Sequence, residues 1–282
     1  MRIVVKVSLL LIFTLSNTLW AAGNPLLVFA GAASKPPTEE VAAVFEKETG
    51  IKVDLLFGGS GYVLSQMILG KKGDLYFPGS SDFMELAKKK GVVLSETERK
   101  VVYLVPAINV YKGNPKNIRK LSDLTRAGLR VVIARPDTVC VGLYAVEIIE
   151  KNLTPSQIDR VKKNIVNYAE SCEKTATYVS LLSADAVIGW SVFQYWDPER
   201  IETIHLAKEE VLRIGYIPIA ISRYTRDSNN AQKFIDFLLS ERGKAIFRKH
   251  HYFMSPEEAF LYIGEEKPIG GEYRVPQSWL GK

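Results

Sequence analysis

The sequence predicts an α/β protein built as two lobes, each with a mostly parallel sheet flanked by helices. Short β-branched or apolar runs alternate with helical patterns along most of the chain, which is typical of βαβ units. Small-residue turns follow the first three of these runs. Two long extended runs, interrupted at Pro106 and Pro218, are suited to carry the chain from the first lobe to the second and back.

Composition agrees with a globular protein that has a sizeable core. The chain has 282 residues, of which 47% are hydrophobic and 24% charged, an ordinary balance for one large or two medium domains. The formal net charge is +6, but Lys and Arg are interspersed with Asp and Glu and form no basic run. A nucleic-acid partner is therefore not indicated.

Residues 1–22 have the pattern of a secretory signal peptide. Arg2 and Lys6 precede the apolar run 7–15, which is too short to span a bilayer, and Ala21-Ala22-Gly23 offers small residues for cleavage. No cysteine lies near this point, so we expect no lipoprotein anchor. We therefore expect export to the periplasm.

The elements follow in order, with Gly50 and Gly91 as helix stops. We expect strands at Leu26–Ala30, Ile51–Phe57, Asp74–Phe77, Val101–Val105, Ile108–Tyr111, Arg130–Ala134, Ile165–Tyr168, Ala186–Trp190, Thr203–Leu206 and Leu212–Ala220. We expect helices at Thr38–Thr49, Val63–Leu69, Asp82–Lys90, Leu121–Leu124, Leu143–Lys151, Lys174–Leu182, Asn229–Leu239 and Glu241–His250. Lobe 1 then comprises residues 23–106 and 217–254, lobe 2 comprises 107–216, and 255–282 form a Gly- and Pro-rich tail.

Two strand-to-helix turns suggest an anion site. Gly58-Gly59-Ser60-Gly61 and Gly31-Ala32-Ala33-Ser34 each join a strand to a helix. Backbone N–H groups at a helix N-terminus attract anions, and ligands of open α/β sheets bind at the carboxyl ends of strands. Ser34 and Ser60 could thus converge on one small anion, although such glycines often serve only the turn. Pro78-Gly79-Ser80-Ser81 is a third loop of this kind, where Ser80 or Ser81 could add a donor.

Several motifs together resemble one known family. They are Val28–Ser34, Phe45–Val53, Phe57–Gly61, Gly73–Tyr76, Val139–Ala145, Asp185–Trp190 and Gly243–Phe247. The chain up to about Phe253 resembles the molybdate/tungstate-binding proteins of bacterial ABC importers. That resemblance implies the type II periplasmic-binding-protein fold, in which two lobes close over an oxyanion in the cleft between them.

The resemblance also implies which residues bind the ligand. Ser34 and Ser60 match two serines that donate through hydroxyls, while Val141 and Cys172 match positions that donate through loop amides. Trp190 falls where the family usually has Tyr, and it can donate only through its indole N–H. Neutral, pre-oriented donors of this kind suit a buried dianion.

The two cysteines depart from the family pattern. Cys140 stands where the family usually has Pro, and the resemblance places Cys140 and Cys172 in neighbouring loops of lobe 2. We expect a disulfide between them, because paired cysteines of exported proteins are commonly structural. The alternative is a thiol pair that binds a soft metalloid or senses redox state.

Enzyme chemistry has little support in the sequence. A hydrolase using Ser60 would lack the second Gly of the G-x-S-x-G elbow, and the histidines are only His205, His250 and His251. No metal constellation, phosphate-binding loop or dinucleotide fingerprint is present. We therefore expect no enzyme, no cofactor and no metal beyond the bound oxyanion.

The expected function is capture of molybdate or tungstate, which the sequence does not distinguish, by a monomer that closes about a hinge. The resemblance implies delivery to an ABC permease in the inner membrane. The alternative is a periplasmic sensor subunit that uses the same cleft to report an oxyanion or metalloid.

Overall fold

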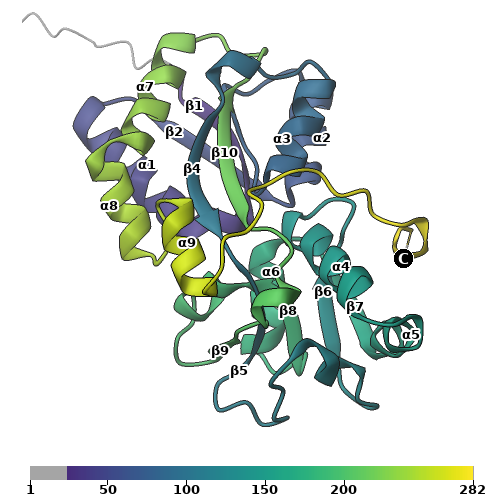
Figure 1. Cartoon of the computed structure of the whole chain (residues 1–282). Helices are drawn as coiled ribbons and strands as arrows, with labels where there is room; N and C mark the ends of the chain where they lie inside the picture. Colours follow the sequence, from purple (N-terminus) through teal and green to yellow (C-terminus); the bar gives the residue numbers. More distant parts are fainter. Residues whose placement is uncertain (1–23, 282) are drawn as a thin grey trace, which may run out of the picture.

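The computed structural model describes residues 24–281, so the predicted signal peptide over residues 1–22 lies outside the described residues. This part of the chain forms two α/β lobes, each built on a five-stranded sheet (Figure 1). The strands are β1 (Leu26–Gly31), β2 (Val53–Gly58), β3 (Leu75–Phe77), β4 (Arg99–Leu104), β5 (Pro106–Tyr111), β6 (Val131–Ala134), β7 (Ile165–Ala169), β8 (Ala186–Trp190), β9 (Ile201–Ile204) and β10 (Gly215–Ile221). The helices are α1 (Lys35–Thr49), α2 (Ser60–Gly70), α3 (Ser81–Lys89), α4 (Cys140–Asn152), α5 (Pro155–Asn164), α6 (Cys172–Ser180), α7 (Ser228–Leu239), α8 (Glu241–Lys249) and α9 (Pro256–Ile263).

Lobe 1 is built on the sheet with strand order β2-β1-β3-β10-β4. β1 pairs in parallel with β2 and β3, while β10 runs antiparallel to both β3 and β4. The central strands β1, β3 and β10 are apolar and largely buried, as expected for strands covered on both faces. The carboxyl ends of β1, β2 and β3 therefore open toward the same edge, where α1, α2 and α3 begin.

Lobe 2 repeats this plan with the strand order β7-β6-β8-β5-β9. β6 is parallel to β7 and β8, whereas β5 is antiparallel to β8 and β9. α4 and α6 follow β6 and β7, so their N-termini lie at the carboxyl edge of this sheet.

Up to the end of β10 the chain passes between the lobes twice, as the extended runs predict. β4 ends at Leu104 and β5 begins at Pro106, and the return leads into β10. Pro218 does not end β10; the pairing register with β4 shifts between Ile217 and Pro218 instead, because proline has no N–H to donate to the ladder. The larger cluster of buried apolar side chains runs from lobe 1 into lobe 2, so the lobes share a packed interface.

Four helices begin two or three residues earlier than predicted. α1, α2, α4 and α6 start at Lys35, Ser60, Cys140 and Cys172, whereas the sequence predicts starts at Thr38, Val63, Leu143 and Lys174. Ser171 caps α6 by accepting a hydrogen bond from the Lys174 N–H at 3.1 Å. The predicted donors Ser60, Val141 and Cys172 therefore lie in first helical turns rather than in the loops before them.

Two helices are missing from the sequence prediction. α5 follows Thr154, whose side chain forms a capping box with Gln157, and Pro155 stands at the first helical position. α9 begins at Pro256 after Ser255, whose side chain accepts a hydrogen bond from the Glu258 N–H. Both helix starts therefore carry a capping residue followed by a proline.

The segment predicted as a tail packs against both lobes. After α9, an isolated bridge pairs Ile269 with Ile214, and the chain then crosses from lobe 1 toward α5 in lobe 2 (Figure 1). Trp279 near its end is 1% exposed and its indole N–H donates to Glu150 of α4. We call residues 264–281 the strap.

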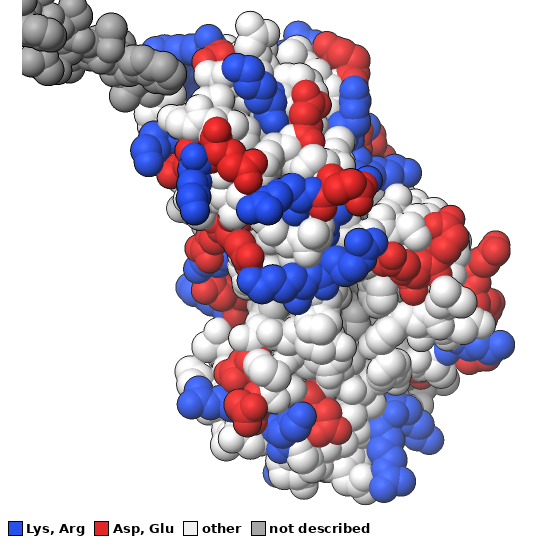
Figure 2. All heavy atoms as spheres, turned by 90° about the vertical axis from the view of Figure 1, so that its left-hand side faces the viewer, with Lys and Arg blue, Asp and Glu red and all other residues white. Residues whose placement is uncertain are grey.

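The surface agrees with the charge pattern of the sequence. Figure 2 shows Lys and Arg side chains interspersed with Asp and Glu on the face presented. Among residues 24–281, none of the helices is both long and apolar enough to cross a membrane.

Candidate functional site

The carboxyl edges of the two sheets face each other, and the lobes touch there. The Gly61 N–H of α2 donates to the Thr138 carbonyl of lobe 2 at 2.8 Å. Lys35 of α1 forms an ion pair with Glu173 of α6, also at 2.8 Å. A Cβ placed on Gly59 would lie 2.8 Å from the carbonyl oxygens of both Thr138 and Glu170. The structure is therefore the closed arrangement of the two lobes.

Ser60 opens α2 and is 1% exposed. Its hydroxyl oxygen accepts a hydrogen bond from the Gly79 N–H at 2.9 Å, which leaves the hydroxyl proton free to be donated. The Tyr76 hydroxyl donates to the Ser60 carbonyl at 3.0 Å. Ser60 is thus held in place by two other segments of lobe 1.

Ser34 precedes α1 and is fully buried. Its hydroxyl oxygen accepts a hydrogen bond from Thr38 Oγ1 at 3.1 Å, so its own proton is also free to be donated. The neighbouring Ala33 carbonyl accepts a 2.6 Å hydrogen bond from the Tyr252 hydroxyl. This contact ties the first turn of lobe 1 to the end of α8.

Val141 and Cys172 lie in the first turns of α4 and α6, and both are buried. The Sγ atoms of Cys140 and Cys172 are 3.4 Å apart, and both cysteines are free thiols. This separation exceeds the roughly 2.05 Å of a disulfide bond, so the two sulfur atoms are not bonded in this structure. The disulfide stays a prediction. Burial, together with the Cys140 thiol, raises the pKa of the Cys172 thiol well above its ordinary value, while the Val141 amide and the Trp190 indole act to lower it.

Trp190 ends β8 and is fully buried. Its ring packs edge-on against Tyr144, with the ring centroids 4.9 Å apart. Its Nε1–H has no hydrogen-bond partner, although it is near enough to Cys172 to affect the pKa of that thiol. A buried donor without a partner is costly, so this N–H is available to a ligand.

The structure brings Ser60, Val141, Cys172 and Trp190 into one buried neighbourhood with Cys140 and Gly79. A Cβ on Gly79 would lie 2.5 Å from Cys140 Sγ, and one on Gly31 would lie 2.7 Å from Ser60 Oγ. Ser34 lies at the same edge of the lobe 1 sheet.

Sequence reasoning missed the contributions of Gly79, Tyr76 and Tyr252. Burial raises the pKa of both tyrosine hydroxyls well above the ordinary value, so they remain neutral donors. The sequence feature that could have identified Gly79 is the third small-residue loop, Pro78-Gly79-Ser80-Ser81. In that loop Ser80 Oγ is buried without a hydrogen-bond partner, whereas Ser81 donates to the Gly271 carbonyl at 3.1 Å.

A cavity of about 630 Å³ lies between the lobes beside these residues. Lobe 1 contributes Ala32, Phe57, Gly58, Gly59 and Tyr62 to its lining, and lobe 2 contributes Arg135, Thr138, Glu170, Ser171, Glu173 and Lys174. The charged side chains of this lining are of both signs, and Lys174 pairs with Glu170, whereas the candidate donors beside the cavity are neutral.

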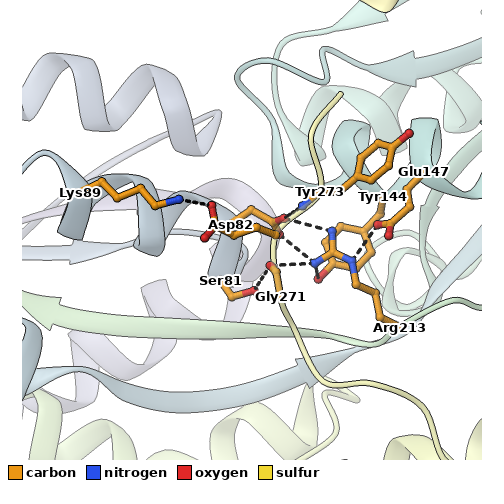
Figure 3. Close-up of polar contacts among 9 residues, drawn as sticks. Ser81, Asp82, Lys89, Tyr144, Glu147, Arg213, Gly271 and Tyr273 are labelled. Atoms are coloured by element: carbon orange, nitrogen blue, oxygen red, sulfur yellow. Dashed lines mark hydrogen bonds and ion pairs between the residues drawn. The ribbon is translucent and has the colours of Figure 1, made fainter. Parts of the chain in front are cut away.

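A second contact region between the lobes is centred on Arg213 (Figure 3). Arg213, which precedes β10, pairs with Asp82 of α3 in lobe 1 at 3.0 Å and with Glu147 of α4 in lobe 2 at 2.7 Å. It also donates to the Gly271 carbonyl of the strap at 3.0 Å and to the Tyr144 hydroxyl at 3.1 Å. One buried guanidinium therefore joins both lobes and the strap.

Metal coordination has no support in the described part of the chain. Within residues 24–281, no group of three or more His, Cys, Asp or Glu side chains is placed to hold a metal ion.

Known proteins share this fold. A putative binding protein of Haemophilus influenzae is 29% identical over 79% of this chain and 88% of its own length. The periplasmic molybdate-binding protein of Azotobacter vinelandii superposes with a TM-score of 0.70 at 19% identity, covering 82% of this chain and 99% of that one. The periplasmic binding protein AfuA of Actinobacillus pleuropneumoniae, with exogenous fructose-6-phosphate bound, gives 0.69 at 18% identity over 86% of each chain. The model of one family matches residues 26–253, and this chain belongs to that family, the bacterial extracellular solute-binding proteins.

Proposed function

We propose that this protein captures a tetrahedral oxyanion of the molybdate or tungstate type in the periplasm and delivers it to an ABC permease. The observation that carries the proposal is the set of helix N-termini that meet across the closed cleft. Ser34 and Ser60 come from lobe 1, and Val141 and Cys172 from lobe 2, and all four are buried. Helix N-termini supply partial positive charge without a counter-ion.

Neutral donors explain how such a site holds a dianion. Each hydroxyl or amide that points to a charged oxygen makes a charge-assisted hydrogen bond, which is stronger than a neutral one. Trp190 Nε1–H adds a buried donor that lacks a hydrogen-bond partner among residues 24–281. The ligand bridges both lobes in the closed form, so its differential contacts shift the hinge equilibrium toward closure.

The cavity supports a second candidate, an organic ester of such an oxyanion. Its volume of about 630 Å³ falls in the range of roughly 300–1,000 Å³ that small organic ligands occupy, and exceeds what a bare tetrahedral ion needs. Arg135, Glu170, Glu173 and Lys174 line it, so its charged side chains offer both donors and acceptors to the polar groups of an organic part. The fructose-6-phosphate in the AfuA structure gives this candidate a precedent within the fold.

Titration calorimetry with molybdate, tungstate, sulfate and a sugar phosphate distinguishes the two candidates. Tight binding of molybdate or tungstate supports the first, and tight binding of the sugar phosphate alone supports the second. The variant Ser34→Ala/Ser60→Ala should weaken binding of the preferred ligand by about 3 kcal/mol, a little over 100-fold. Ser65→Ala, which removes an exposed hydroxyl from the same α2 helix, is the matched control. Unchanged affinity in the double variant would contradict the site.

A further inference from the structure

Cys140 and Cys172 are a pair of buried thiols that oxyanion capture by hydroxyls and amides does not use. They are the first residues of α4 and α6, and each is 1% exposed. Their Sγ atoms lie 3.4 Å apart in a contact where either thiol can donate. Two separate segments of lobe 2 thus present their sulfur atoms side by side.

Lobe 1 covers this thiol pair. The Gly79 backbone lies directly on Cys140, since a Cβ at Gly79 would be 2.5 Å from the Cys140 sulfur. A ligand can reach the sulfurs only when the lobes separate. This inference rests on the proposed function only in one point, which is that the cleft between the two lobes must open.

The Cys172 thiol is protonated at neutral pH. Burial and the neighbouring Cys140 raise the pKa of the Cys172 thiol well above its ordinary value. A cysteine with so little thiolate is a poor nucleophile for redox catalysis. The pair is better suited to a ligand that accepts the two thiol protons itself as it binds.

Ordinary divalent metals do not fit this pair. Structural zinc takes four protein ligands and catalytic zinc three, and no group of three His, Cys, Asp or Glu side chains is arranged for a metal within residues 24–281. Two thiols instead fit a centre that bonds to two sulfurs and keeps an oxygen of its own. The unpartnered Trp190 Nε1–H beside Cys172 is placed to donate to such an oxygen.

We propose that Cys140 and Cys172 form a binding site for a trivalent, thiol-seeking metalloid hydroxide, of which arsenous acid is the simplest. Each S–H gives its proton to one hydroxyl of the acid, two water molecules leave, and two sulfur–arsenic bonds form. As(OH)₃ and two thiols thus yield (RS)₂AsOH and two waters, with no change of oxidation state. The remaining hydroxyl accepts a hydrogen bond from the Trp190 indole.

The test uses the mature protein, reduced and then freed of reductant without air, and titrated with arsenous acid. Native mass spectrometry should show one adduct that has lost two waters. Cys140→Ser and Cys172→Ser should each weaken binding about 100-fold, because the second bond of the chelate is lost. Wild-type protein in which Cys140 and Cys172 have been oxidised to a disulfide should bind no arsenous acid. This sample tests the thiol site without any substitution.

Failure of this inference and failure of the proposed function give different results. Absence of the adduct in reduced wild-type protein, or full affinity in either Ser variant with a wild-type circular dichroism spectrum, overturns the thiol site. A parallel molybdate titration reports on the oxyanion function separately. If the protein binds molybdate but not arsenous acid, the transport proposal stands and the thiol site is rejected. If it binds arsenous acid but not molybdate, the thiol site stands and the transport proposal is rejected.

Discussion

Arg213 and Asp82 form a two-pronged ion pair that joins the return connection between the lobes to the first turn of α3. Arg213 Nη1 lies 3.2 Å from Asp82 Oδ2, and Nη2 lies 3.0 Å from Oδ1. Both side chains are at least nine-tenths buried, and Glu147 of lobe 2 shares the same guanidinium (Figure 3). The pair therefore couples the position of lobe 1 to that of lobe 2.

Replacing Arg213 by Met should destabilise the protein by about 3–5 kcal/mol, because Asp82 and Glu147 would be left as buried carboxylates without a cation. Urea denaturation monitored by circular dichroism measures this loss. Lys174→Met is the matched control, since its ion pair with Glu170 is exposed and should contribute less than about 1 kcal/mol. Equal effects of the two changes would show that Arg213 does not hold the lobes.

The strap gives a second prediction, which concerns Trp279. This side chain is buried against lobe 2, with Lys162 Nζ 4.3 Å from its ring centroid. Nearer to α9, the strap contacts lobe 1, where the Tyr273 N–H donates to Asp82 at 3.1 Å. Trp279→Ala should cost about 3–5 kcal/mol of stability and release one end of the strap.

Small-angle scattering without ligand should then give a larger radius of gyration for Trp279→Ala than for the wild type. Leu261→Ala is the control, because Leu261 on α9 is 83% exposed. An unchanged radius of gyration at full folding would mean that the strap packs on the lobes without restraining their closure.

Gly79→Ala tests whether the closed lobes need a residue without a side chain at this position. The new Cβ would lie 2.5 Å from the Cys140 sulfur and 2.8 Å from the Ala33 Cβ, so closure requires one of them to shift. Overpacking of this kind costs about 1–3 kcal/mol, and we expect ligand affinity to fall by roughly tenfold or more.

Gly70→Ala is the matched control for that experiment. Its added Cβ meets only the flexible side chain of Lys72, at 3.2 Å or more, so affinity should stay at the wild-type value. Calorimetry with the preferred ligand measures both variants. Full affinity in Gly79→Ala would refute the tight packing of lobe 1 on Cys140.

Asp185 gives a prediction for the pH dependence of stability. Burial alone would raise the pKa of this carboxyl, but hydrogen bonds from the Arg130 N–H at 2.8 Å and guanidinium at 2.9 Å lower it overall. A lowered pKa in the folded state contributes stability that is present above the unfolded value of about 3.9 and is lost as the pH falls through the folded value.

The free energy of unfolding of Asp185→Asn should therefore lie about 2 kcal/mol below that of the wild type at pH 7. This difference should shrink as the pH is lowered below about 4. Denaturation at a series of pH values measures it. A difference that is the same at pH 7 and at pH 3 would exclude the ionised Asp185–Arg130 pair as its source.

The sequence by itself determined the two-lobed α/β architecture. Alternating strand and helix patterns, with small-residue turns such as Gly58-Gly59-Ser60, are local signals that need no distant contact to be read. The extended runs around Pro106 and Pro218 likewise predicted the two passages between the lobes. The capped start of α5 was just as local, yet its weakly apolar sequence hid it.

Only the tertiary structure decided which groups meet across the cleft. Gly79 lies on Cys140 because the two sheets bring their carboxyl edges together, whereas Cys140 lies beside Cys172 because the paired strands β6 and β7 of lobe 2 lead into α4 and α6. No periodicity of the chain encodes either distance. The strap shows the same limit. Its Gly- and Pro-rich sequence predicts a tail, because the stabilising contacts of Tyr273 and Trp279 are with residues more than a hundred positions away. Local propensity specifies elements, whereas the packing of side chains from distant segments specifies the site.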